Sequence, residues 1–428
     1  MGQAAANSAG NHAACAERFG APFARTPPSM LRQRLLPILA AGLLLAVLNR
    51  GEAVVTPAAL EEGVDRSPRF ARHELERGVE LDSAVAADFT GDGRPDVVAA
   101  GPKWMVLHER TADAWKRRVI RSVSDEQKSL FSITLQAVDM DRDSDLDILT
   151  CDPHANTLDW YENPGTSVNT GDAMWPRHLI DRLPKVHSQA LQDLDGDGKP
   201  ELVANVEGRL VYYALPDRIR QAGPHGDAAA PGSWVRKTLT EDGVEGTPHY
   251  LRFARLGDRL RLLTGAPDAG YIGWWDAPAQ PGGVWSRRVL RPMPGASHLI
   301  PADVNHDGET DLVYIKGHTT GIGWLAGPRF ETDAVIDTDR VAEPHAADVA
   351  DVDGDGAPDV IAAARKSGGL HLWHNNGRGA FTASPLDPTQ LGLDLRATDM
   401  DRDGDLDILV AGGAGNNLVW YENLKRRP

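Results

Sequence analysis

The stretch D-V-D-G-D-G-A-P-D, from Asp351 to Asp359, places four carboxylates on alternate residues and a glycine at the sixth position. Side chains at alternate positions of so short a loop converge only when the chain wraps around a central ion. Ca²⁺ takes six to eight oxygen ligands, and glycine permits the sharp bend that such wrapping needs. We therefore expect a calcium site, with the carbonyl of Ala357 and four side chains as ligands, those of Asp351, Asp353, Asp355 and Asp359. The alternative is a solvated acidic turn.

The residues that follow this loop distinguish it from an EF-hand. An EF-hand needs a bidentate Glu at position twelve and a helix on either side. Here the loop ends at its ninth residue and continues into the apolar segment 360–363, which we predict to be a strand. The site is therefore expected to be a strand–loop–strand calcium site.

The same pattern begins at five other positions, and the six loops are separated in turn by 51, 54, 110, 48 and 48 residues. The 110-residue interval holds two periods, because the segment 249–258 at its middle keeps the hydrophobic frame without the acidic ligands. We predict seven units, six of them with metal, and repetition in register argues against solvated turns. The other expected side-chain ligands are Asp88, Asp92, Asp96, Asp139, Asp141, Asp143, Asp147, Asp193, Asp195, Asp197, Glu201, Asp303, Asn305, Asp307, Asp311, Asp399, Asp401, Asp403 and Asp407.

A repeat of about 50 residues made of short strands is typical of a β-propeller. In the sixth unit the first strand covers 346–350 and the second 359–363, while third strands are aromatic, as in 418–422. Fourth strands open with an aromatic residue and basic residues, as in 115–120, and we interpret the Trp residues as packing between blades. We predict an all-β, seven-bladed β-propeller of four-stranded blades. The segment at 70–75 precedes the first unit, so this N-terminal strand is expected to complete the last blade and hide its edge.

The loops, together with W-Y-E-N sequences at Trp160 and Trp420, resemble the FG-GAP or VCBS repeats of integrin-like propellers. The resemblance covers about residues 70–428, and it implies the propeller fold and bound calcium. Ser144 stands in the glycine position of the second loop, so this loop is expected to bind calcium most weakly, since glycine adopts the required conformation freely. The family ranges from adhesins to enzymes, so the fold alone does not define the function.

The N-terminal region has the pattern of a secretory signal peptide. Two arginines precede the apolar run 35–48, and small residues follow at positions 51 and 53. A run of this length is short for a membrane span. We expect residues 1–53 to be an N-terminal extension and signal peptide, starting at Met1 or Met30, and residues 54–428 to be the propeller. The protein is then exported to the periplasm or the extracellular space, and its mature chain has no membrane span and only one cysteine, Cys151.

The net charge of −16 excludes nucleic acid and anionic membranes as natural partners. The expected ligand positions of the six loops alone account for 22 of the carboxylates. We therefore attribute the charge to the expected metal sites rather than to an interaction surface.

The resemblance also implies that the first strands lie innermost, so that their beginnings surround the axis on the face opposite the calcium loops. The positions six residues before the loops hold Asp82, His187, His249 and His345. His298 and Asp394 lie one residue nearer to their loops, and unit two offers only the segment 132–134 at this place. One residue of offset reverses the direction of a strand side chain. Turns between second and third strands add Lys103, Asp152, His154, Glu207, Asp268, Lys316, His318, Arg365 and Lys366.

Histidines at one repeat-equivalent place converge on the axis, whereas a single histidine at a strand start is usually a structural hydrogen bonder. Imidazoles mixed with carboxylates suit Zn²⁺, Mn²⁺ or Fe²⁺ better than Ca²⁺, and they suit acid–base catalysis near neutral pH. We name candidate ligands and catalytic groups on this axial face: His187, His249, His298 and His345, with His154 and Glu207 as candidate bases on the rim.

Two classes of function follow. In the first, the protein is a metal-dependent sugar lyase or dehydratase, and the layout is similar to the propeller domain of aldos-2-ulose dehydratase and related exported sugar-processing proteins. In the second, it is a non-catalytic module that binds a glycan or an extracellular protein. A quinone-dependent sugar dehydrogenase fits less well, because the sequence has no quinone-binding pattern.

Overall fold

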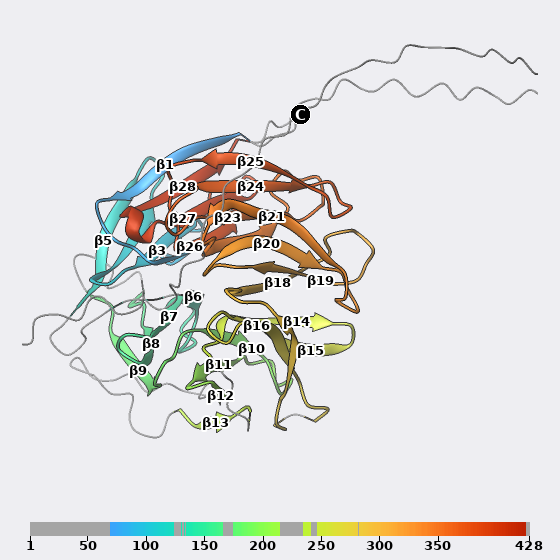
Figure 1. Ribbon diagram of the computed structural model, residues 1–428. Coiled ribbons are helices and arrows are strands. Elements are labelled where there is room, and N and C mark those ends of the chain that lie inside the picture. Colours follow the sequence, from blue (N-terminus) through green and yellow to red (C-terminus); the bar gives the residue numbers. More distant parts are fainter. Residues whose placement is uncertain are drawn as a thin grey trace, which may run out of the picture. The chain divides into compact units, whose positions relative to one another are not determined.

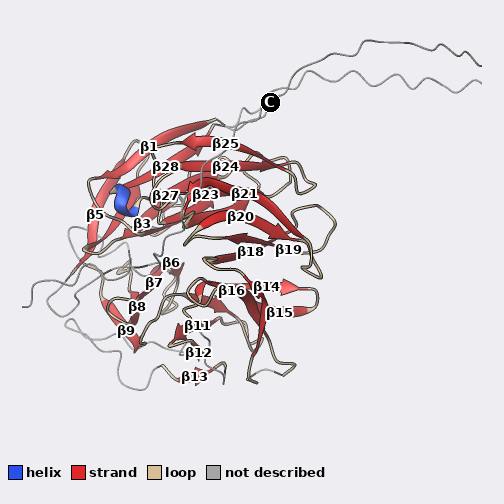
Figure 2. Ribbon diagram, in the orientation of Figure 1, coloured by secondary structure: helices blue, strands red, loops and turns tan. Residues whose placement is uncertain are grey.

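Strands make up nearly all of the regular structure in the computed structural model, which describes residues 69–123, 130, 132, 134–165, 174–214, 234–240, 246–280 and 282–424. A short 3-10 helix at Gly413–Gly415 is the helical element of this part of the chain (Figure 2). The expected extension and signal peptide at 1–53, and the expected boundary at 54, lie outside the described residues.

The strands form seven antiparallel sheets of four strands each, arranged as the blades of a propeller (Figure 1). In each of the first six blades the strands follow sequence order from the axis outward. The first three blades comprise β2 (Ser83–Ala87), β3 (Asp96–Ala100), β4 (Trp104–Arg110) and β5 (Trp115–Ser122); β6 (Leu135–Val138), β7 (Asp147–Asp152), β8 (Thr157–Tyr161) and β9 (Arg177–Arg182); and β10 (Gln189–Gln192), β11 (Glu201–Val206), β12 (Arg209–Ala214) and β13 (Arg236–Thr238).

The fourth to sixth blades have the same order. They comprise β14 (His249–Leu256), β15 (Arg259–Ala266), β16 (Tyr271–Asp276) and β17 (Ser286–Pro292); β18 (His298–Ala302), β19 (Asp311–Ile315), β20 (Thr320–Leu325) and β21 (Asp333–Ala342); and β22 (Ala346–Ala350), β23 (Asp359–Ala363), β24 (Leu370–Asn375) and β25 (Phe381–Asp387). The all-β, seven-bladed propeller is thus confirmed.

The seventh blade joins the two ends of the described chain. Its inner strands are β26 (Asp394–Thr398), β27 (Asp407–Ala411) and β28 (Asn417–Asn423), and its outermost strand is β1 (Phe70–Arg77). Phe70 pairs with Asn423 and Arg77 with Asn417, so β1 covers β28 along its whole length. The expected closure by the N-terminal strand is confirmed, and it leaves the β28 edge paired.

Second strands are continuous runs of buried aliphatic residues, because they are covered on both faces by neighbouring blades. Most of the tryptophans pack in the same interfaces, as expected, although Trp104 is exposed. Trp175, for example, is fully buried in a cluster that combines Phe89 and Leu107 of blade one with Ile148 of blade two. Inner strands of adjacent blades contact one another, including β2 with β26 across the closure, and this brings the strand beginnings together around the axis.

Candidate functional site

Each acidic loop is closed by its own first and last carboxylates. The side chain at the first position accepts a hydrogen bond of 2.8–3.1 Å from the backbone N–H at the sixth position. The side chain at the ninth position accepts another, of 2.7–3.1 Å, from the N–H at the second position. The backbone therefore holds the carboxylates in place on one side of the loop.

The loop carboxylates lie close enough to share an ion. In the second loop, oxygens of Asp139, Asp141 and Asp147 all lie within 4.8 Å of one another, and the loops at Asp193 and Asp351 contain similar groups. Burial, opposed by backbone hydrogen bonds, raises the pKa of Asp147 to about 8, and burial together with Asp143 raises that of Asp141 to about 6. Crowded carboxylates of this kind stay ionised more readily beside a cation. Their oxygen chemistry and crowding fit Ca²⁺.

The glycine position of each loop adopts a left-handed conformation. Gly356 has φ +94° and Gly404 has φ +94°, and Ser144 at the same place in the second loop has φ +81°. Residues with a Cβ are strained there, so the weaker calcium binding of the second loop stays a prediction with a conformational basis. The fourth position is also left-handed, even where it is Arg142 or Arg402, which the sequence pattern did not indicate.

Unit four replaces its missing loop with an internal ion pair. Arg261 opposes Asp276 in the β15–β16 ladder, as Glu201, the last ligand of the third loop, opposes Ala214 in the blade before. The Arg261 guanidinium donates through Nε to Asp276 Oδ1 at 2.7 Å and through Nη1 to the Leu256 carbonyl at 2.7 Å. A fixed side-chain cation thus stands in this blade at a position that is acidic in the others.

The asparagine that ends the W-Y-E-N sequence joins neighbouring units. Asn163 donates its backbone N–H to Asp147 of its own loop, and its side-chain amide donates to the carbonyl of Phe89 in the preceding loop. Asn423 does the same with Asp407 and Val352. These hydrogen bonds give the W-Y-E-N sequence a structural role, since its asparagine links each loop to the neighbouring blade.

A hollow lies at the axis on the face opposite the loops, where the first strands begin. It has a volume of about 580 Å³. Its lining comes from strand beginnings and from turns between second and third strands, and comprises Glu80, Asp82, Pro153, His154, His187, His249, His318, His345, Arg365, Lys366, Gly392, Leu393, Gly412 and Ala414. We call this hollow the axial pocket. The predicted convergence of repeat-equivalent residues is therefore seen for Asp82, His187, His249 and His345.

Four of the five imidazoles that line the axial pocket lie close together. The rings of His187 and His249 lie 3.7 Å apart, and those of His249 and His318 lie 4.9 Å apart. His345 completes the group, with its ring 5.6 Å from that of His318. His318 comes from the turn between β19 and β20. The sequence places His318 among the turn residues of this face, at the place that His154 occupies in unit two, but does not identify it as a ligand.

His298 points away from this group. Its ring stacks on Tyr250 at 3.8 Å and its Nδ1 lies 2.8 Å from Ser297 Oγ. It lines a second cavity of about 140 Å³, together with Tyr250, Arg252 and Arg396. The one-residue offset of His298 explains this placement, since it reverses the side-chain direction in a strand.

The remaining predicted residues, Asp394, His154 and Glu207, lie in three different places. Asp394 accepts hydrogen bonds from Ser83 Oγ at 2.6 Å and from the Ala84 N–H at 3.2 Å, so it links the seventh blade to the first. His154 is exposed on the rim of the axial pocket. Glu207 is exposed in the β11–β12 turn and is not among the residues that line the pocket.

Burial sets the protonation of the axial pocket. It lowers the pKa of His187 to about 3, lowers that of His345 to about 4, and holds that of His249 well below its usual value. The imidazoles are therefore neutral at physiological pH. Burial, with Glu80, raises the pKa of Asp82 to about 7, and its Oδ2 is enclosed without a hydrogen-bond partner. Asp82 is a carboxyl group able to exchange a proton near neutral pH.

Comparison with known proteins agrees with this architecture. A family model described as an FG-GAP-like repeat matches residues 139–204, 303–362 and 351–410. The chain is a β-propeller that carries FG-GAP-like repeats. Integrin-like propellers fit this description. No protein of curated function matches the sequence of this FG-GAP propeller.

A solved structure of an Agrocybe aegerita lectin resembles the FG-GAP propeller in fold. It is described as showing specific recognition of non-reducing terminal N-acetylglucosamine. The two chains are 16% identical, with a TM-score of 0.52, and the match covers 82% of this chain and 87% of the lectin chain. At this identity the likeness shows a shared fold.

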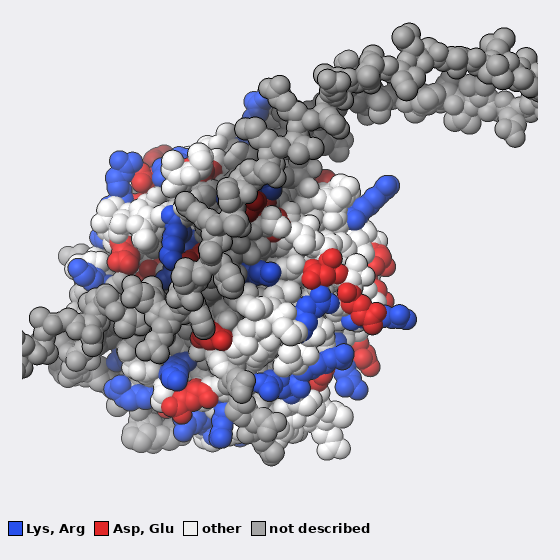
Figure 3. All heavy atoms as spheres, viewed as in Figure 1, with Lys and Arg blue, Asp and Glu red and all other residues white. Residues whose placement is uncertain are grey.

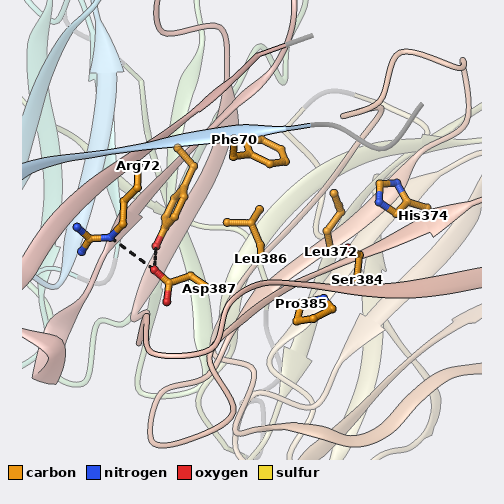
Figure 4. A pocket seen from close by; sticks show the side chains of 9 residues that line it. Phe70, Arg72, Leu372, His374, Ser384, Pro385, Leu386 and Asp387 are labelled. Atoms are coloured by element: carbon orange, nitrogen blue, oxygen red, sulfur yellow. Dashed lines mark hydrogen bonds and ion pairs between the residues drawn. The ribbon is translucent and has the colours of Figure 1, made fainter. Parts of the chain in front are cut away.

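A second hollow of the FG-GAP propeller, of about 290 Å³, lies between the sixth and seventh blades (Figure 4). Its polar groups already pair with one another: Asp387 accepts from Tyr421 at 2.8 Å and forms an ion pair with Arg72 at 3.5 Å. His374 lies 3.3 Å from Asp353 of the adjoining loop. Few groups are left to hold a ligand, so the axial pocket is the stronger candidate site.

The surface adds two observations about partners. On the face shown in Figure 3, acidic and basic side chains of the described residues are interspersed rather than gathered by sign. Among the residues that the structure describes, no helix is long and apolar enough to cross a membrane.

Proposed function

We propose that this FG-GAP propeller is an exported, calcium-stabilised carbohydrate-binding module whose ligand occupies the axial pocket. The observation that carries the proposal is the pocket itself. About 580 Å³ is enough for a small saccharide, and the lining combines hydrogen-bonding groups with the apolar surfaces of Pro153, Leu393 and Ala414. Sugars present hydroxyl groups beside apolar ring faces, and such a lining complements both.

Charged groups at the pocket give a ligand its orientation. Lys366 is held by Glu343 through a 2.7 Å ion pair. The Arg365 side chain, by contrast, makes no ion pair or hydrogen bond with the described residues, and it lines the pocket at an exposed position. An unengaged guanidinium of this kind can donate several hydrogen bonds to sugar oxygens.

The fold supports this proposal without defining the ligand. The Agrocybe aegerita lectin shows that a chain with this architecture can serve in sugar recognition. Calcium bound on the opposite face would stabilise the pocket, because six occupied loops would keep the blades, and hence the pocket lining, in register. Binding to an extracellular protein through the same face is the alternative partner.

A glycan array probed with calcium-loaded protein tests the proposal. We expect a restricted set of glycans to bind, and Arg365→Ala to weaken that binding at least tenfold. Arg378→Ala is the matched control, because Arg378 is also exposed but does not line the pocket. Binding of no glycan, or equal binding by both variants, would contradict the proposal; an extracellular protein retained through the same face would then be the better account.

Asp82 favours a second function, a metal-dependent sugar lyase or dehydratase. A carboxyl group with a pKa of about 7 in a pocket is suited to removing a proton next to a sugar carbonyl. Incubation with a panel of oxidised and reduced sugars tests this function. Asp82→Asn should abolish turnover while glycan retention persists; absence of product with every sugar would leave the binding module as the function.

A further inference from the structure

Three of the five imidazoles that line the axial pocket form a group with metal-ligand spacing. His249 begins β14, His318 lies between β19 and β20, and His345 directly precedes β22. One ring nitrogen from each lies within 4.8 Å of the other two. These residues come from three consecutive blades, so the group depends on the ring and not on one local sequence motif.

The group contains enclosed nitrogens with nothing to bind. His249 Nδ1 and His318 Nε2 are shielded from solvent and have no hydrogen-bond partner. His249 as a whole is 3% exposed. Buried polar atoms are normally paired, so two unpaired imidazole nitrogens within one histidine group indicate a place for a ligand.

His345 is oriented by its surroundings. Its Nδ1 lies 3.0 Å from the Leu393 carbonyl and 3.2 Å from the Tyr250 hydroxyl. A carbonyl only accepts, so Nδ1 carries the proton and Nε2 keeps its lone pair. A hydrogen bond from the far nitrogen to a carbonyl is the usual way in which a metal-binding histidine is held in position.

We propose that His249, His318 and His345 bind one divalent transition metal ion of the zinc class in the axial pocket. Neutral imidazoles suit Zn²⁺, Co²⁺ or Ni²⁺, whereas Ca²⁺ takes oxygen ligands, so this site differs in chemistry from the six loops. Three histidines leave a coordination position open toward the pocket. His187, whose tilted ring lies against that of His249, would act as a positioning residue.

The metal extends the proposed function, since a sugar hydroxyl or carbonyl could occupy the open position. Metal binding does not require the sugar, however, and it can be measured alone. Failure of glycan binding and failure of metal binding are therefore separate results.

Titration with Co²⁺, in the presence of saturating Ca²⁺, tests the site through the visible absorption of tetrahedrally bound cobalt. We expect one Co²⁺ per chain, displaced by Zn²⁺. His318→Ala should lower the affinity at least tenfold, and because His318 is half-buried in a turn the variant should fold. His298→Phe is the matched control: it removes a neighbouring imidazole, keeps a ring on Tyr250, and should bind Co²⁺ as the wild type does.

Calcium-dependent melting of each variant establishes that it is folded. If His318→Ala melts like the wild type and still binds Co²⁺ with wild-type affinity, the proposal is overturned. It is also overturned if the wild type shows no cobalt absorption once the loops are saturated with calcium. Should His318→Ala fail to fold, His318→Gln and the wild-type stoichiometry decide the question in the same way.

Discussion

The two faces of this propeller are built by different rules. On the loop face, each set of carboxylates lies within nine consecutive residues and recurs in six of the seven units. On the axial face, each unit contributes between one and four residues to the pocket, and the pocket depends on what differs between the units. The comparison shows that the repeat supplies a scaffold, while departures from the repeat supply a site.

Unit four shows the same division within a single blade. It has no acidic loop, and Arg261 with Asp276 takes the place of the expected ion. The same unit contributes His249 and Tyr250 to the axis through a bulge in β14, where Tyr250 has a left-handed φ of +44°. Strained backbone of this kind is concentrated at functional sites. The blade that lost the repeated feature thus provides central residues of the axial face.

Removal of β1 should have the largest effect, because both faces depend on a closed ring. Deleting residues 54–78 removes the strand that covers β28 from Phe70 to Arg77. We expect insoluble protein, since an open hydrophobic edge favours aggregation. Expression and size-exclusion chromatography measure the outcome; a soluble, fully folded truncation would show that the ring closes without β1.

Chelation of calcium, with the second largest expected effect, tests the loop face separately from the axial face. Close carboxylate pairs repel by about 1 kcal/mol each even in water, so emptying six loops should lower the unfolding midpoint by on the order of 10 °C. Thermal melting with and without chelator measures the shift. An unchanged midpoint would mean that the loops do not stabilise the fold through calcium.

Arg261→Ala sharpens the comparison between unit four and the other units. The variant leaves Asp276 without its charge-assisted hydrogen bond, which we expect to cost about 2 kcal/mol. Unlike the stabilisation by the loops, this loss of free energy of unfolding should be the same with calcium and with chelator. Arg259→Ala, an exposed neighbour, is the control and should change the free energy of unfolding little. A calcium-dependent loss at Arg261 would argue against its role as a built-in cation.

Ser144→Gly should have the smallest effect. It relieves a left-handed serine in the second loop and is expected to gain about 1 kcal/mol, or about fivefold in calcium affinity at that loop. Calorimetric calcium titration of the variant and the wild type measures the difference. Equal affinities would mean that Ser144 is not what weakens the loop.

The loop face could be predicted from the sequence because its ligands are local and repeated. The axial face could be predicted only in part. Repeat-equivalent placement identified His187, His249 and His345, and the offset of His298 was a reason to doubt its convergence. His318 could not be assigned, because its approach depends on turn geometry and on the packing of adjacent blades, neither of which a sequence period describes. Tyr250, which lines the second cavity with His298, depends on the bulge in β14.

Anomalous X-ray diffraction from crystals that contain both calcium and cobalt tests most directly the claim that the two faces have different roles. The account predicts a single cobalt peak, bounded by His249, His318 and His345 on the axial face, and calcium at the six acidic loops. Cobalt found in the loops but absent from the axis, or density for calcium among the three histidines, would contradict it.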